Sequence, residues 1–423
     1  MGSIQAAHAL LIREAHGLMT RVQRIRPFAQ YEPMVPAANV SALARNAIER
    51  SLADGRSELR RRIQDYLRWL NSPIGSSISP PQARRRLSLL RLRFNAVLTR
   101  FDLFADVLTQ RSEHEAGIWL AGLDAAAADA LALPGYYRAP PAVCYLDRGM
   151  GAAIRRARTR LPGGGENPVA IIRVPRERMV GSGVASSLFH EVGHQAAALL
   201  NLVASLRSAI AAHPRVGTGG WVYWDRWISE ILADLWAVAR LGVGATLGLV
   251  ATLNLPRAFV FRVELDDPHP FPWIRIRLGC ALGQSLYPDP QWERLARIWK
   301  ALYPLASLPA DIRRLIAELE AGMPDLIGLI LAHRPYSLRG RSLIEVLDTA
   351  PRQPQRLRAT LDDWLIEPMR MYRMPPALVL AVLGQAAADE RLSPQGESRL
   401  LGKLLTHWAL QGALRTPARC ATA

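Results

Sequence analysis

Two histidines and a glutamate are spaced so that they can bind a metal ion. His190, Glu191 and His194 form an H-E-x-x-H pattern. In a helix, residues four apart lie one turn apart on the same face, so both imidazoles can reach one ion. Glu191 lies about 100° round the helix from His190, where its carboxylate can bind a water molecule on the open side of that ion. So short a pattern also arises by chance, and a third ligand is needed to support it.

A candidate third ligand lies in the next strongly apolar segment, residues 227–236. This segment carries two carboxylates four residues apart, Glu230 and Asp234, among tryptophan, isoleucine and leucine. A carboxylate buried without a partner costs several kcal/mol, and a metal with its histidine ligands would supply the partner. We therefore predict that His190, His194 and Glu230 bind Zn²⁺ and that Asp234 bonds the second ring nitrogen of His190.

At this point the chain resembles the gluzincin class of zinc peptidases, in which H-E-x-x-H is followed by E-x-x-x-D on a second helix. Gly193 makes the first motif H-E-x-G-H, and residues 269–276 read H-P-F-P-W-I-R-I. Both features are similar to the CaaX-processing and heat-shock zinc proteases, which carry H-P-x-x-x-x-R-I. The resemblance covers residues 165–280 and implies a zincin-like core that hydrolyses peptide bonds. Those relatives are mostly built into membranes, whereas the longest charge-free run here, residues 241–256, is too short for a membrane span.

Three protein ligands leave the fourth zinc position open, as in catalytic zinc sites. Zinc lowers the pKa of a bound water to about 7. We expect Glu191 to act as the general base that takes the proton of this water and passes it to the leaving amine. The expected substrate is a peptide or a protein.

The oxyanion of such a reaction needs a second electrophile besides the metal. His269 is the first candidate, because the resemblance places its motif near the site and prolines flank it; the alternative is that it braces a turn. Tyr223 is the second candidate, and an aromatic so placed is more often packing. Arg275 either binds a substrate carboxylate or supports Asp234 or Glu230 from behind, and the second use is favoured.

Other functions compete with the peptidase. His190, His194 and Glu230 can belong to two amphipathic helices whose polar groups satisfy each other. They can also belong to a non-catalytic protein in which zinc stabilises the core and basic helices bind an anionic or protein partner. A di-iron bundle would need a second E-x-x-H, which the chain lacks. A further possibility is a peptidase kept latent by its own N-terminal helices.

The chain has 423 residues and a formal net charge of +17, carried almost entirely by arginine. This charge permits anionic partners. Arg84, Arg85 and Arg86, together with residues 60–62, could bind phosphates, but no nucleic-acid module accompanies them; a solvated helix face is favoured and a nucleic-acid partner is not expected. The three cysteines are widely spaced, which predicts a reducing compartment. With no signal-peptide core at its start and no membrane span, the chain is expected to be cytoplasmic.

Hydrophobic periodicity predicts a mostly α (α+β) protein with a small sheet. Strands are expected at residues 142–147 and 169–174, with a short helix at 152–160 and a flexible glycine connection at 163–165. The second strand either pairs with an extended substrate at the sheet edge or is internal. The expected organisation is an N-terminal helical region (1–135), a zincin-like catalytic core (136–284) and a C-terminal helical region (285–423).

Overall fold

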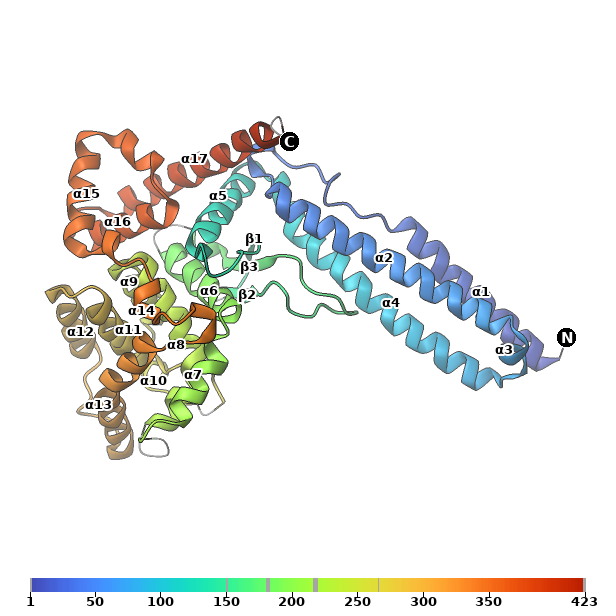
Figure 1. Cartoon of the computed structure of the whole chain (residues 1–423), viewed down its shortest axis with the longest axis horizontal. Helices are drawn as coiled ribbons and strands as arrows, with labels where there is room; N and C mark the ends of the chain where they lie inside the picture. The colour runs from blue at the N-terminus through green and yellow to red at the C-terminus, as the bar shows by residue number, and fades with distance from the viewer. Residues whose placement is uncertain (1, 150, 180–182, 216–219, 265, 421–423) are drawn as a thin grey trace.

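The computed structural model describes residues 2–149, 151–179, 183–215, 220–264 and 266–420. Helices make up 72% of the structure and the sheet has three strands, which confirms a mostly α protein with a small sheet. A long helical arm projects from a larger helical body (Figure 1). No helix in the described part of the chain is both long enough and apolar enough to cross a membrane.

Three long amphipathic helices form the arm: α1 (Ser3–Arg24), α2 (Ala42–Leu70) and α4 (Pro80–Thr109). The short helix α3 (Pro73–Ser77) turns the chain between α2 and α4. The Ser41 hydroxyl accepts a hydrogen bond from the Ala44 backbone and caps α2, and a proline begins α4. Their apolar stripes face one another and bury leucines and isoleucines such as Leu18, Ile48 and Leu59 in a cluster of their own.

The sheet lies between the arm and the body. Its strands are β1 (Ala142–Asp147), β2 (Ala153–Arg155) and β3 (Ala170–Pro175), in the order β1-β3-β2. Successive side chains of a strand point to opposite faces. Val143 and Ile171 accordingly belong to the hydrophobic cluster of the arm, whereas Cys144 and Ile172 belong to that of the body. The sheet therefore joins the two cores.

The structure confirms the first predicted strand and shifts the second by one residue. The helix predicted at residues 152–160 is wrong: this segment forms β2, which pairs antiparallel with β3, and then turns through Arg158 with φ 64°. Pairing with a distant strand outweighs the local helical pattern. Of the two alternatives for residues 169–174, the structure shows the internal strand, because β3 is the central strand and β2 lies at the edge.

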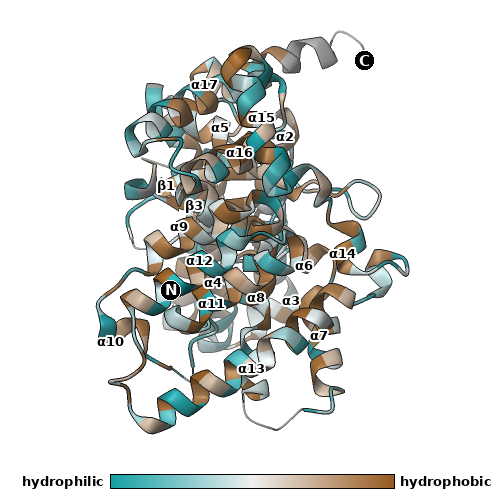
Figure 2. Ribbon diagram, turned by 90° about the vertical axis from the view of Figure 1, so that its left-hand side faces the viewer, coloured by the Kyte–Doolittle hydropathy of each residue, from teal (hydrophilic) through white to brown (hydrophobic). Residues whose placement is uncertain are grey.

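Four helices of the body surround the candidate site: α6 (Gly183–Leu199), α8 (Trp221–Leu241), α9 (Val243–Leu253) and α11 (Pro272–Leu286). Helix α7 (Leu202–Ala211) packs on α8. Helix α8 is buried along almost its whole second half, and mostly hydrophobic residues meet at the centre of the body (Figure 2). Gly242, with φ 60° and ψ −137°, ends α8 and redirects the chain into α9.

One hydrophobic cluster runs from Leu120 in α5 (His114–Leu131) to Trp408 near the C-terminus. The expected boundaries at residues 135 and 284 both fall inside its span. The remaining helices are α10 (Arg257–Val260), α12 (Pro290–Leu302), α13 (Ala310–Ala332), α14 (Leu343–Val346), α15 (Pro354–Ile366), α16 (Pro376–Ala388) and α17 (Pro394–Cys420). Helix α16 packs on α8 and α9, and α17 packs on α5.

Candidate metal centre

Helices α6 and α8 come into backbone contact at Gly193. A Cβ atom at this position would lie 2.8 Å from the Cα and the carbonyl oxygen of Ala233 and 2.9 Å from the Cβ of Trp236. Glycine is therefore required for this approach. The histidines on either side of Gly193 consequently face Glu230, one turn before Ala233 on the neighbouring helix.

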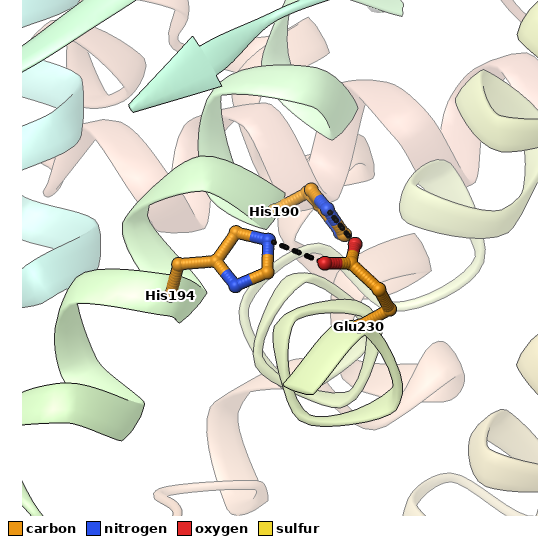
Figure 3. Close-up of side chains that lie close together, drawn as sticks. All are labelled: His190, His194 and Glu230. Carbon is orange, nitrogen blue, oxygen red and sulfur yellow. Dashed lines mark ion pairs between the residues drawn. The ribbon is translucent and has the colours of Figure 1, made fainter. Parts of the chain in front are cut away.

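The predicted ligands His190, His194 and Glu230 converge, and their ligand atoms lie within 4.8 Å of one another (Figure 3). The Nε2 of His190 is 3.2 Å from Oε2 of Glu230, and the Nε2 of His194 is 3.4 Å from Oε1. Two ligands of one tetrahedral zinc ion, with bonds of about 2.0–2.1 Å, are separated by about 3.3 Å. The two contacts of Glu230 therefore have the spacing of ligands that share an ion.

The environment of the Glu230 carboxylate also fits a cation. Its Oε2 is buried and, among the described residues, receives no hydrogen bond of good geometry despite the nearby ring nitrogens. Burial alone would raise the pKa of Glu230, but His190, His194 and His269 outweigh it and lower the pKa well below the ordinary value. Two imidazoles and one carboxylate suit zinc, and they also suit other divalent transition metals.

Asp234 and Arg275 support the first histidine from behind. The Nδ1 of His190 lies 2.8 Å from Oδ1 of Asp234, the hydrogen bond expected from the sequence. Arg275 donates to both oxygens of Asp234, from Nε at 2.7 Å and from Nη2 at 2.8 Å. Of the two uses considered for Arg275, the structure shows the support of Asp234. These hydrogen bonds orient the imidazole of His190 and leave its Nε2 directed at Glu230.

Arg275, Asp234 and His190 shift one another's pKa values. Burial would raise the pKa of Asp234, but Arg275 and His190 outweigh it and lower the pKa well below the ordinary value. Burial would lower the pKa of His190, but Asp234 outweighs it and raises the pKa to about 9. A metal ion that binds His190 takes the place of this proton, so metal binding is coupled to proton release.

Glu191 is buried beside the cluster, with 7% of its surface exposed. Burial raises the pKa of its carboxyl, and His190 and His194 offset part of that rise. Glu191 lines a cavity of about 140 Å³ between α6, α8, α9 and α11. The described residues that line this cavity come from position 151 onward, so the N-terminal arm does not cover it.

His269 reaches the cluster from the loop before α11. Its Nε2 lies 3.1 Å from Oε2 of Glu230, and its Nδ1 lies 2.7 Å from Oδ1 of Asp267, which also accepts a hydrogen bond from the His269 backbone. The ring is 45% exposed and lines the same cavity as Glu191. Among the described side chains, His269 is not part of the mutually close group of three ligands. It therefore lies beside the candidate metal site.

Tyr223 lies elsewhere. Its ring packs 5.1 Å from that of Trp227 and is half-buried. It precedes Glu230 by two turns of α8, about 10 Å along the helix axis. The structure thus places Tyr223 in aromatic packing and does not bring it to the ligands.

Two positioning residues were missed in the sequence. Gln195, directly after His194, is buried and accepts a hydrogen bond from the Ala157 backbone at 2.7 Å, which ties α6 to the segment after β2. Asp267 braces His269. The only local signal for Gln195 was its polar side chain on a buried helix face, and its partner is 38 residues away. The only local signal for Asp267 was its position two residues before His269.

The chain matches no protein-family model, no curated protein and no solved structure. The likeness to zinc peptidases is therefore carried by the motif residues alone. Their convergence from two helices and a loop is a property of the fold, since Glu230 and His269 lie 40 and 79 residues beyond His190.

Proposed function

We propose that this protein is a zinc-dependent metallopeptidase with a zincin-like core. The observation that carries the proposal is the convergence of His190, His194 and Glu230 beside the buried carboxylate of Glu191. Three donors leave a position for water, as catalytic zinc sites require. Zinc, when bound, supplies the Lewis acidity that makes water nucleophilic near neutral pH.

Glu191 is the general base of the proposed reaction. Its carboxyl lines the cavity, where it can take a proton from the attacking water and return it to the leaving amine. Burial raises the pKa of its carboxyl. A raised pKa favours both the uptake of the proton from water and its return to the leaving amine. Asp234 and Arg275 fix the orientation of His190 during the reaction.

His269 is the proposed stabiliser of the oxyanion. It is the half-exposed imidazole that faces the same cavity as Glu191, and Asp267 fixes its ring. Its Nε2 is the ring atom directed at the cluster. A donor held in advance where charge develops is the usual source of transition-state stabilisation.

The surroundings of the cavity favour an extended peptide substrate. Ala152 lines the cavity and leads directly into β2, whose outer edge is unpaired within the described sheet. A peptide strand can add to such an edge through main-chain hydrogen bonds. Ala237, Val238 and Ala245 form part of the cavity wall, which favours an uncharged substrate side chain next to the scissile bond.

The test compares metal content and cleavage. The purified protein should contain about one zinc per chain and cleave members of a broad peptide library. Glu191→Gln should keep the metal and lose cleavage, whereas Glu293→Gln, an exposed glutamate on α12, should change neither. His194→Ala should lose both metal and cleavage, with the exposed His16→Ala as its control.

The second candidate, a non-catalytic protein stabilised by zinc, predicts a different result. It is favoured by the ion pairs that link Glu230, His190, Asp234 and Arg275, which can serve stability alone. In that case the wild type and Glu191→Gln would both bind zinc and neither would cleave any peptide. Cleavage by Glu191→Gln at the wild-type rate would overturn the proposed mechanism.

A further inference from the structure

The far end of the arm has an extreme charge composition. We define the arm tip as residues 2–13 of α1 together with residues 66–95, which include the end of α2, α3 and the first half of α4. The arm tip contains seven arginines and no aspartate or glutamate. In Figure 1 these segments meet at the end of the arm that is remote from the body. The tip is therefore a concentrated positive surface.

Two of these arginines, Arg84 and Arg85, are exposed and have no ion-pair partner within the described chain. Arg86 lies 4.0 Å over the ring of Trp69. Three others reach acidic residues outside the tip: Arg68 with Asp65, Arg91 with Glu14 and Arg93 with Glu58. Arg84 and Arg85 are thus free to bind an external anion.

The arm tip also exposes large aliphatic side chains. Ile4, Leu10, Ile74, Leu89 and Leu92 are between 57% and 70% exposed. On α4, positions 85, 89 and 92 follow helical spacing, so an arginine and two leucines share one outward face. Leu10 of α1 lines the same surface hollow as Arg84 and Arg85. Single exposed aliphatic side chains are ordinary, but five at one end beside unpaired arginines form an amphipathic surface.

We propose that the arm tip docks on membrane surfaces that contain anionic phospholipids. Arginine guanidinium groups bind lipid phosphates, and the aliphatic side chains enter the boundary between headgroups and acyl chains. A nucleic acid would satisfy the arginines but would gain little from exposed aliphatic chains, so a lipid surface fits both properties of the tip. The attachment is peripheral and does not depend on the proposed peptidase activity.

The shape of the molecule suits this role. Helix α4 has 30 residues and is about 45 Å long, so a docked tip would keep the body well away from the lipid surface. Helices α6 and α8, which carry the candidate ligands, lie in the body (Figure 1), and none of the described residues that line the cavity beside them belongs to the tip. Docking would therefore fix the location of the protein and leave the site accessible.

The experiment is co-sedimentation of the full-length protein with vesicles of phosphatidylcholine alone or of equal parts phosphatidylcholine and phosphatidylglycerol. Binding is expected only to the anionic vesicles and should weaken as salt is added. Arg84→Glu combined with Arg85→Glu should weaken binding by about tenfold or more. Leu89→Ser combined with Leu92→Ser should weaken vesicle binding but leave binding to a short single-stranded RNA unchanged.

Matched controls come from α12, which exposes the same residue types on the body. Arg294→Glu with Arg297→Glu, and Ile298→Ser with Leu302→Ser, should leave vesicle binding unchanged. Circular dichroism melting checks that each variant is folded. The proposal is overturned if the wild type does not prefer anionic vesicles, if the arm and α12 variants lose binding equally, or if the protein binds only RNA.

Discussion

Gly193 of α6 rests directly on the backbone of Ala233 in α8. This contact sets the distance between the helix that carries His190 and His194 and the helix that carries Glu230. The glycine of the H-E-x-G-H sequence thus has a structural explanation: any side chain would separate the two histidines from Glu230.

Gly193→Ala should therefore weaken metal binding and the fold together. The new Cβ would lie 2.8 Å from backbone atoms of Ala233, which cannot rotate away. Overpacking of this kind costs about 1–3 kcal/mol. Thermal melting and competitive chelator titration measure the two effects. Gly328→Ala is the control, because it is an exposed helical glycine with open space around it and should stabilise the protein slightly. An unchanged melting temperature and metal affinity in Gly193→Ala would refute this account.

Asp234→Asn should lower metal affinity by about tenfold to a hundredfold, the usual effect of removing a carboxylate that orients a histidine ligand. Asparagine keeps the shape of the side chain but loses the charge that binds His190 and Arg275. Chelator titration is the readout. Asp225→Asn, at a half-buried position on the same helix that pairs with Arg207, should leave affinity unchanged. Equal affinities in the two variants would show that Asp234 serves packing alone.

The size of Leu249 should influence the choice of substrate. This side chain is half-buried in the cavity wall, so its replacement disturbs the core little. Leu249→Ala should favour peptides with larger side chains next to the cleaved bond, and Leu249→Phe should favour smaller ones. Cleavage-site profiling on a peptide library shows the shift. Leu247→Ala on the same helix, also half-buried, is the control. A profile that is the same in all three variants would place the substrate side chain elsewhere.

Arg358 should stabilise the packing of α15 and α16 in a pH-dependent manner. It donates to both oxygens of Asp389, at 2.9 and 3.1 Å, and to Asp289 at 3.0 Å. Burial would raise the pKa of Asp389, but the hydrogen bonds from Arg358 outweigh it and lower the pKa. Because the folded state then binds its proton less readily than the unfolded state, the stabilisation is present above the ordinary aspartate pKa of about 3.9 and is lost as the pH falls through the lowered value.

Denaturant unfolding of the wild type and of Arg358→Met measures this effect. The difference in free energy of unfolding should be on the order of 1 kcal/mol at neutral pH, since the pair is partly exposed, and should shrink in acid. Arg370→Met removes an exposed pair with Glu367 and should have almost no effect at either pH. A difference that grows in acid would contradict the assignment.

Local patterns were enough to predict the long helices and which three side chains converge. Residues such as Ile48, Leu52 and Leu59 recur with helical spacing and are buried, and the motif spacing located His190, His194 and Glu230. Features that depend on distant partners were not predicted. Strand β2 has three residues and exists through its pairing with β3, and Gln195 acts on a backbone group far away in the sequence. Helical spacing likewise does not distinguish a helix of an arm from a helix of the body.

The two-sided sheet makes the arm inseparable from the rest of the molecule. One face of β1 and β3 supplies Val143 and Ile171 to the core of the arm. A fragment that begins at α5 and lacks the arm would therefore expose those side chains to water. Such a fragment would tend to self-associate, whatever the state of its metal ligands. The root of the arm can therefore change only in step with the strands on which it packs.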